Sequence, residues 1–362
     1  MIRIATIGTS QITESLLEAV EACPEASFAG ACSRARGRAE AFCARHGGGH
    51  AFTSVEEVAQ ARGVDAVYIA SPNALHRGQA LACIAGGKHV LVEKPLGSNR
   101  REAEEVFEAA DAAGVVAMEA MRPLHDPAFR ACQAALPELG RIRRATLRFG
   151  KRSSRYDEVL AGRHTNIFDC NMSSGALMDM GIYPVEALVA LLGEPESISF
   201  APVLLDESTR GTTNGPIDGA GTILARYPGM AASLHYSKIT NDLCESQVEG
   251  EEGTLLIDAI STPTRAVLNL RGPTPAGGGY TPLAVEPLEL ELNAVANNMV
   301  FEVADFACAV TAVQEGAAPA EAQAGPYGSV AGFQGATLSA LRITDEARRQ
   351  AGIAFPADEG AC

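Results

Sequence analysis

The sequence predicts an α/β protein, with a doubly wound parallel sheet in an amino-terminal domain and a mostly antiparallel open sheet in an α+β carboxyl-terminal domain. Two observations support this prediction. Up to about residue 120, short apolar β-type runs alternate with longer Ala-, Glu- and Arg-rich helical stretches, which requires right-handed crossovers and parallel strands. Beyond residue 122, apolar and polar residues alternate singly, as in a sheet that buries one face.

Glycines mark the ends of several predicted helices in the first domain, residues 1–122. Gly47, Gly86 and Gly114 each follow a helical stretch, at a position where a left-handed backbone favours glycine. The expected strands, in chain order, are IRIATIG, SFAGACS, AVYIAS, KHVLVE and GVVAMEA. The helices between them are ITESLLEAVEAC, RGRAEAFCARHG, ALHRGQALACIAGG and NRREAEEVFEAADAAG.

The second domain, residues 123–362, is expected to combine its sheet with three helices. Its strands lie within RIRRATLRFG, ILARYPGMAASLHYSK, SQVEGEEGTLLID and RAVLNL, where YPGM and GEEG are turn signals. One long helix is expected from about Ser174 to Leu192 and another over NNMVFEVADFACAV. The last, over ATLSALRITDEARRQAG, is expected to pack back on the first domain.

Composition favours a soluble protein that acts on a small molecule. The chain has 29 Lys and Arg against 44 Asp and Glu, a net charge of −15, which argues against nucleic acid or an anionic membrane as the main partner. MIRIATIG lacks the apolar core of a signal peptide, and the apolar runs are too short to span a bilayer. Nine scattered cysteines without C-x-x-C spacing predict reduced thiols in the cytoplasm, and HGGGH is no preformed metal site, so no metal is expected.

The first predicted strand ends in a glycine turn. In IGTSQIT, Gly8 stands where the dinucleotide fingerprint G-x-G-x-x-G begins, but Ser10 and Thr13 replace the later glycines. Ser10 is small enough for the backbone to approach a pyrophosphate. An ordinary turn is the alternative, but the place of this turn at the start of an alternating domain favours cofactor binding by Gly8, Thr9, Ser10 and Ile12.

The end of the second strand bears on the choice between NAD and NADP. NAD enzymes place an acidic residue there for the ribose hydroxyls, whereas ACSRARGR has none. Ser33, Arg34 and Arg38 would instead suit a 2′-phosphate through charge-assisted hydrogen bonds. The alternative is that both arginines are solvated residues at a helix start. We favour NADP over NAD.

The fifth strand leads into HVLVEKPLGSN, which puts Glu93 and Lys94 at the carboxyl edge of the sheet. Ligands of doubly wound sheets bind at that edge. A partly desolvated lysine there has a pKa that falls readily toward the working range of an acid–base catalyst. We therefore predict that Lys94 is catalytic and that Glu93 lies beside the cofactor.

These motifs carry a family resemblance over nearly the whole chain. EKP, SPNALH, SSGALMDMGIYPVEALVALLG, EAMRPLHDP, SSRYD and ITDEARRQAGIAFPADE resemble the Gfo/Idh/MocA family of oxidoreductases. The resemblance implies a Rossmann domain that binds NAD or NADP, a second domain with a mixed sheet, and a cis peptide at Pro95. It also implies hydride transfer to or from a hydroxyl or carbonyl of a sugar, polyol, dihydrodiol or related compound. The turn at Gly8 resembles a branch in which the later glycines are replaced.

The resemblance also identifies a second catalytic segment. The family pattern G-G-x-L-x-D-x-G-x-H places its aspartate at Asp179 and its histidine at Tyr183. Tyrosine at this position resembles the branch of glucose–fructose oxidoreductase and dimeric dihydrodiol dehydrogenase, where it is paired with the EKP lysine. Tyr183 would then exchange the substrate proton while Lys94 lowers the phenol pKa, and Asp179 would orient Lys94 or bind a substrate hydroxyl. Taken alone, GIYP favours a core aromatic on an amphipathic helix, and the family resemblance reverses that preference.

Further site residues are proposed from their places in the chain. Asn73 could instead cap a helix, and Arg122 could form a structural ion pair. We assign to the cofactor Ser71, Asn73 and His76, which follow the fourth strand, and Arg122, which lies at the domain junction. We assign to the substrate pocket Arg155, Tyr156 and Asn166, together with Lys94, Asp179 and Tyr183.

Two other function classes stay open at this point. One is a glycosidase-type enzyme that uses bound NAD for transient oxidation, and the other is a non-catalytic dinucleotide-binding regulator. Lys94, Asp179 and Tyr183 disfavour the regulator, because a binding module needs no proton-transfer groups. A homodimer or homotetramer is expected by resemblance only.

Overall fold

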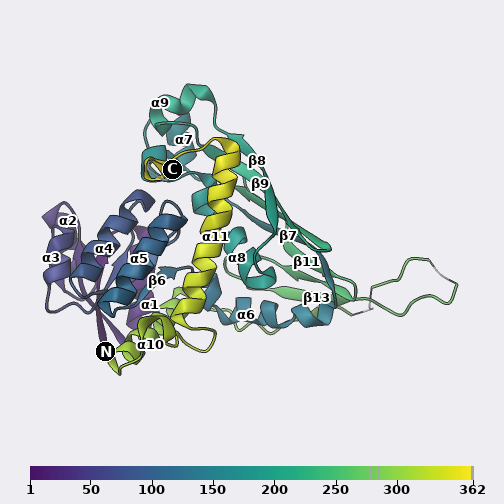
Figure 1. The fold of residues 1–362 in the computed structure, drawn as a ribbon, viewed down its shortest axis with the longest axis horizontal. Helices are drawn as coiled ribbons and strands as arrows, with labels where there is room; N and C mark the ends of the chain where they lie inside the picture. The colour runs from purple at the N-terminus through teal and green to yellow at the C-terminus, as the bar shows by residue number, and fades with distance from the viewer. Residues whose placement is uncertain (278, 284–285, 360–362) are drawn as a thin grey trace. The chain divides into compact units, whose positions relative to one another are not determined.

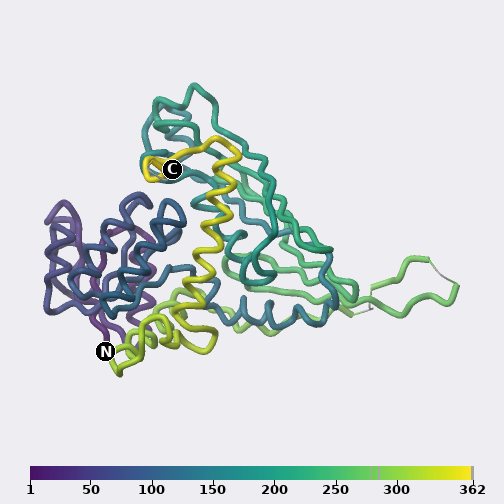
Figure 2. Tube along the Cα trace, viewed as in Figure 1, coloured from purple at the N-terminus to yellow at the C-terminus, as the bar shows by residue number. Residues whose placement is uncertain are grey.

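The computed structural model describes residues 1–277, 279–283 and 286–359, which form two compact units (Figures 1 and 2). The first unit contains Met1–His125, Ala296–Arg342 and residues 357–359. The second contains Asp126–Val295 and Ile343–Pro356. The sequence placed the domain boundary after residue 122 and assigned everything beyond it to the second domain.

The first unit is built on a parallel six-stranded sheet, as predicted. Its strand order is β3-β2-β1-β4-β5-β6. The edge strand β3 was not predicted, because three residues after a run of glycines are too few to show a periodic pattern. The strands are β1 Ile2–Ile7, β2 Ala26–Cys32, β3 His50–Phe52, β4 Ala66–Ile69, β5 His89–Glu93 and β6 Ala117–Ala120.

Helices pack on this sheet, and its central strands β4 and β5 are almost entirely buried. Helix α4 packs against α3 and α5, while α1 packs against α10 (Figure 1). Gly47 and Gly114 adopt positive φ after their helices, but Gly87 rather than Gly86 does so after α4. The helices are α1 Gln11–Ala22, α2 Arg36–Arg45, α3 Val55–Gln60, α4 His76–Ala85, α5 Arg100–Ala113 and α10 Met299–Gln314.

The second unit is built on an eight-stranded sheet of order β14-β13-β12-β11-β7-β10-β9-β8. The sheet is mostly antiparallel, as predicted, although β7 and β10 pair in parallel. Strand β8 was not predicted; its residues alternate between exposed and partly exposed, and none of them is fully buried. The strands are β7 Ile142–Gly150, β8 Ser197–Leu204, β9 Asp218–Tyr227, β10 Met230–Ser237, β11 Ser246–Gly250, β12 Gly253–Ile257, β13 Ala266–Leu270 and β14 Leu288–Glu289.

The long helix expected from about Ser174 is divided in the structure. A π-helical turn, Leu177–Gly181, precedes α8, Ile182–Leu192, which packs on β7 and β10. The last helix, α11, Val330–Ala351, contributes residues to both units, and Gln334 in its first part donates to the Ala117 carbonyl of β6. The other helices of the second unit are α6 Pro127–Ala134, α7 Arg155–Leu160 and α9 Arg210–Thr213.

One segment is longer and more apolar than the sequence reading allowed. An 18-residue window within Cys170–Leu192 has a mean hydropathy of 1.5, and the segment could cross a membrane by length and composition alone. However, 72% of that window is buried inside the protein. Such burial is typical of a core helix that is apolar on most sides.

Candidate active site

The carboxyl edge of the six-stranded sheet gathers the predicted cofactor residues. Because the strands are parallel, the segments after β1, β2, β4, β5 and β6 all emerge there. The strand order reverses between the neighbours β1 and β4, and doubly wound sheets bind ligands at such a switch point. The predicted residues at or just beyond this edge are Gly8, Thr9, Ser10, Ile12, Ser33, Arg34, Arg38, Ser71, Asn73, His76, Glu93, Lys94 and Arg122.

The turn after β1 is shaped for an anion. Gly8 has φ 114°, and a Cβ there would lie 2.6 Å from the Ala70 carbonyl oxygen, so only glycine fits. Ser10 is the N-cap of α1 but accepts no capping hydrogen bond, and its Oγ lies 3.3 Å from the Thr13 hydroxyl. The first-turn amides of α1 therefore point outward with the positive end of the helix dipole. This arrangement fits the pyrophosphate of a dinucleotide.

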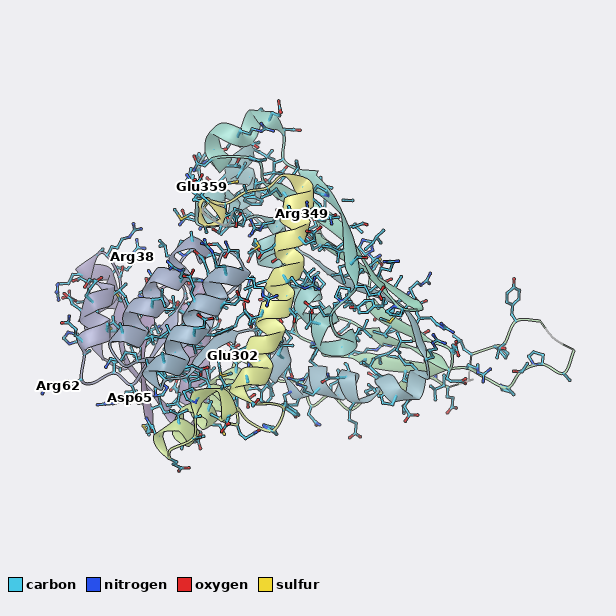
Figure 3. The ribbon with its side chains drawn as sticks, viewed as in Figure 1. Arg38, Arg62, Asp65, Glu302, Arg349 and Glu359 are labelled. Atoms are coloured by element: carbon cyan, nitrogen blue, oxygen red, sulfur yellow. The ribbon has the colours of Figure 1, made fainter. Side chains whose placement is uncertain are left out.

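Two exposed arginines follow β2. Ser33 is fixed by its N–H, which donates to the Phe52 carbonyl at 3.1 Å. Arg34 and Arg38 are exposed, and neither forms an ion pair with any described residue; Figure 3 shows Arg38 extending from α2. Their guanidinium groups are thus available to a phosphate, which fits the 2′-phosphate of NADP.

The turn after β5 presents two charged side chains from a buried segment. Within residues 88–99, every residue is buried except Glu93 and Lys94, which are partly exposed. The Lys94–Pro95 peptide is cis, as the family resemblance implied. The Leu96 N–H donates to the buried Glu119 carboxylate of β6 at 2.7 Å, which fixes the far side of the turn. Lys94 is thus held at the sheet edge by backbone contacts on a rigid strand.

His76 links this turn to the loop after β4. Its ring is 1% exposed, with Nδ1 3.0 Å from the Pro95 carbonyl and Nε2 2.8 Å from the Ser71 carbonyl. Burial lowers the pKa of His76, and the hydrogen bonds to the Pro95 and Ser71 carbonyls oppose that shift. Ser71 donates its hydroxyl to Gln79 at 2.7 Å. Asn73 opens a 3-10 turn whose N-cap is Pro72, so Asn73 is not the helix cap that was weighed as its alternative role.

Two acids interact beside the turn after β5: Glu93, which the sequence analysis predicted, and Glu302, which it missed. The Tyr68 hydroxyl donates to the Glu93 carboxylate, and burial raises the pKa of Glu93 while Lys94 and Arg122 oppose that rise. Glu302 on α10 is fully buried, and neither of its carboxyl oxygens has a hydrogen-bond partner among the described residues (Figure 3). Burial and the nearby Glu93 charge raise the pKa of Glu302 well above its ordinary value. The one available signal was an acidic residue inside the apolar stretch NNMVFEVADFACAV.

In the second unit, Asp179 and Tyr183 stand out by their exposure. Within residues 173–188, every residue is buried except these two, which are partly exposed. The Tyr183 ring packs edge-on against Phe149 at a centroid distance of 4.9 Å. Asp179 lies in the π-helical turn, a distortion that is frequent at functional sites. The two side chains therefore reach the surface of one otherwise interior segment.

Asp218 anchors the start of this segment. Its carboxylate accepts the Ala176 and Leu177 N–H groups at 3.1 and 2.8 Å, and the Tyr236 hydroxyl at 2.9 Å. Burial raises the pKa of Asp218 to about 6. The carboxyl thus satisfies backbone donors that the turn leaves without helical partners.

Lys238, directly after β10, is the other residue that the sequence analysis missed. It is 2% exposed, and its ammonium donates to the Asp179 carboxylate. Nothing in the alternating pattern of HYSK distinguishes this lysine from the solvated lysines that commonly end strands.

The predicted substrate residues of the second unit lie on short helices. Arg155 and Tyr156 begin α7, and Asn166 begins a 3-10 turn that ends at Phe168. The Tyr156 and Phe168 rings lie 6.0 Å apart, and the Lys238 ammonium lies 5.3 Å from the Phe168 ring. Arg155 and Asn166 are exposed.

Lys94 belongs to the first unit, whereas Asp179 and Tyr183 belong to the second, so the meeting of these groups stays a prediction. Within the described part of the chain, no three His, Cys, Asp or Glu residues are grouped to hold a metal ion.

Comparison with known proteins identifies the family. Residues 2–121 match the oxidoreductase family with an NAD-binding Rossmann fold, and residues 135–256 match the GFO/IDH/MocA C-terminal domain. The chain belongs to the GFO/IDH/MocA family. The predicted fold class, family and nicotinamide-dependent oxidoreductase activity on CH–OH groups are thereby confirmed.

Several relatives are similar over much or all of the chain. The scyllo-inositol 2-dehydrogenase (NADP(+)) IolU of Bacillus subtilis (strain 168) is 36% identical over 359 residues, covering 99% of this chain and 100% of that protein. The trans-1,2-dihydrobenzene-1,2-diol dehydrogenase of Mus musculus is 32% identical over 64% of this chain and 66% of its own. The structure of KijD10, a 3-ketoreductase from Actinomadura kijaniata in complex with NADP, has a TM-score of 0.74 at 25% identity, covering 96% of this chain and 97% of that chain.

Proposed function

We propose that this protein is an NADP-dependent dehydrogenase or reductase of cyclic polyols and related sugars, acting on one CH–OH group or its carbonyl. IolU, which is similar over the full length of both chains, is named for scyllo-inositol and NADP(+). A second relative is named for a dihydrobenzenediol. Both named substrates are six-membered rings with neighbouring hydroxyl groups, and this shared chemistry supports the substrate class.

The observation that carries the proposal is the pairwise exposure of Asp179 and Tyr183 in an otherwise buried segment. A purely structural tyrosine on this apolar helix would be buried with its neighbours, because burial of the ring is what stabilises such a helix. Instead, Asp179 and Tyr183 are the residues that are partly exposed in this segment. This pattern supports roles in contact with substrate.

The cofactor proposal depends on the carboxyl edge of the first unit. The turn at Gly8 would hold the pyrophosphate, and Ser33, Arg34 and Arg38 would hold the 2′-phosphate. When bound, the nicotinamide would supply hydride transfer to or from the substrate carbon.

Proton transfer falls to Tyr183. In the reducing direction its phenol would donate to the carbonyl oxygen, and in the oxidising direction its phenolate would accept the hydroxyl proton. A free phenol has a pKa near 10, so the charge of Lys94 would be needed to stabilise the phenolate. Asp179 would accept a hydrogen bond from a second substrate hydroxyl. The proposal therefore requires Lys94 and Tyr183 to serve the same substrate oxygen.

Substrate screening tests this function. The purified protein is offered scyllo-inositol, myo-inositol, trans-1,2-dihydrobenzenediol and an aldose with NADP or NAD, and the absorbance of the reduced nicotinamide is followed. We expect turnover of a cyclic polyol with NADP. Retained NAD with glycoside cleavage and no net absorbance change would identify the transient-oxidation enzyme instead. Tight dinucleotide binding without any turnover would identify a regulator.

We also propose a cytoplasmic homo-oligomer. Val203, Leu204 and Leu224 on β8 and β9 are large apolar side chains that are 51%, 40% and 57% exposed, which supports burial against a second copy. Buried thiols such as Cys83 and Cys132 suit a reducing compartment. The net charge of −15 supports a small-molecule substrate rather than nucleic acid or an anionic membrane. Light scattering of wild type and Leu224→Glu, with cell fractionation, tests both points.

A further inference from the structure

We propose that Lys238 is a positioning residue that fixes the Asp179 carboxylate as the acceptor for a substrate hydroxyl next to the reacting carbon. This inference rests on the function proposed above and assigns a source of its preference for polyols. It is drawn from contacts that lie entirely within the second unit.

The ammonium of Lys238 is buried in a way that makes its carboxylate partner necessary. The side chain is 2% exposed, whereas that of Asp179 is 36% exposed. A buried charge is costly unless it is paired and hydrogen-bonded. The pair is therefore asymmetric, with its cation inside the protein and its anion partly at the surface.

The backbone of Lys238 is held on both sides. Its N–H donates to the Gly219 carbonyl at 2.9 Å, and its own carbonyl accepts the Ser153 N–H at 2.9 Å. The Cα of Lys238 is therefore held between the first residues of β9 and the loop that precedes α7. A lysine on a mobile loop could not direct a carboxylate, but one anchored in this way can.

The Phe168 ring also contacts the Lys238 ammonium and restricts its position. Nζ lies 5.3 Å from the ring centroid, within the range of a cation–π contact, and Phe168 is fully buried. Phe168 also packs near Tyr156, one of the predicted substrate residues. Lys238 thus connects the π-helical turn of Asp179 to both short helices that carry predicted pocket residues.

The consequence concerns recognition rather than proton transfer. Asp179 and Tyr183 are the two accessible side chains of residues 173–188, and they are four residues apart. If Tyr183 serves the reacting oxygen, then Asp179 faces a position one substituent away. An ionised, fixed carboxylate there selects substrates with a hydroxyl at that position, because an analogue without it leaves the acceptor unpaired.

The test is a double-mutant cycle measured with scyllo-inositol and with cyclohexanol, which lacks the neighbouring hydroxyls. Lys238→Met and Asp179→Asn are each expected to lower kcat/KM for scyllo-inositol by about 10- to 100-fold, mainly through KM, and by a clearly smaller factor for cyclohexanol. The double variant is expected to be no worse than Asp179→Asn alone, because Lys238 acts through Asp179. The KM for NADP should be unchanged in all three variants.

Lys88→Met is the matched control. Lys88 is 8% exposed and donates to the Ala61 and Val64 carbonyls, so the control also removes a buried ammonium. It is expected to lower the melting temperature without altering substrate preference. Additive losses in the cycle, or equal losses for scyllo-inositol and cyclohexanol, would overturn the positioning role. Inactivity of the wild type toward every polyol would instead mean that the proposed function has failed.

Discussion

The turn after β5 and the segment around the π-helical turn both present two side chains from a buried stretch, but the buried groups beside these side chains differ. Each is a buried stretch with two partly exposed side chains: Glu93 and Lys94 in residues 88–99, and Asp179 and Tyr183 in residues 173–188. The first pair is adjacent because the strand ends there, while the second pair is four apart, as one helical face requires. In the first unit, a buried acid, Glu302, lies near Glu93, whereas in the second a buried cation stands behind an acid.

The comparison shows that the buried charged groups influence the protonation of the accessible ones. Beside Lys94, burial raises the pKa of Glu93, and the charge of Lys94 opposes that rise. Around Asp179, the ammonium of Lys238 favours the ionised carboxylate. The first region is therefore suited to proton chemistry and the second to accepting a hydrogen bond.

The largest expected effect tests the proton-transfer role of the exposed phenol. Tyr183→Phe should lower kcat by about 10²- to 10⁴-fold, the usual contribution of a positioned proton donor, while NADPH binding measured by fluorescence is retained. Tyr227→Phe is the matched control, since the Tyr227 hydroxyl donates to the carbonyl of Gly193, the residue that ends α8, and should not affect turnover. Full activity of Tyr183→Phe would remove Tyr183 from the mechanism.

The next prediction concerns the pH dependence of stability that arises from His89, at the start of the buried strand that leads to Lys94. The Val116 N–H donates to Nδ1 of His89 at 2.9 Å, and burial lowers the pKa of His89 from 6.5 to about 4. Between these values the unfolded chain binds more protons than the folded one, so this contribution to stability is complete above pH 6.5 and is lost as the pH falls toward 4. It amounts to about 3 kcal/mol.

Urea unfolding at a series of pH values measures this dependence. His89→Asn keeps an acceptor for Val116 but does not titrate, so its stability should decline less steeply over the same interval. Burial shifts the pKa of His76 in the same direction, and some decline should therefore persist. Identical slopes for wild type and His89→Asn would show that His89 is not held neutral.

A smaller effect concerns the cofactor edge of the first unit. Arg34→Asp should lower kcat/KM for NADP by about 10- to 100-fold and improve the relative use of NAD, since a charge-assisted hydrogen bond to the 2′-phosphate is lost. Arg36→Asp, at an exposed arginine that begins α2 two residues further on, is the control for the general charge change. An unchanged NADP preference in Arg34→Asp would contradict the assignment.

The smallest expected effect tests whether the buried carboxyl of Glu302 is protonated, in contrast to the buried ammonium of Lys238. Because burial raises the pKa of Glu302, the unfolded chain loses this proton more readily than the folded one, so Glu302→Gln, which does not titrate, should not destabilise the protein at pH 7. The wild type should lose stability relative to this variant as the pH rises, since ionisation is disfavoured only in the folded state. A cost of several kcal/mol at neutral pH would mean that Glu302 is ionised.

The sequence could predict the site residues that lie on recognisable motifs but not those that support them. Lys94 follows a strand, and Asp179 and Tyr183 share a helical spacing, so local pattern and family resemblance locate all three. Lys238 and Glu302 look like an ordinary strand-end lysine and an ordinary helix glutamate. Their importance comes from desolvation, which depends on residues far away in the chain.

The alternation of apolar runs and helical stretches by itself determined the parallel sheet, its carboxyl edge and the residues that gather there, because strand and helix periods are local properties of the chain. Only the tertiary structure decided which charges are buried, which side chains stay accessible in residues 173–188, and that Asp179 is paired with Lys238. Burial depends on what packs from elsewhere, and no local pattern encodes it.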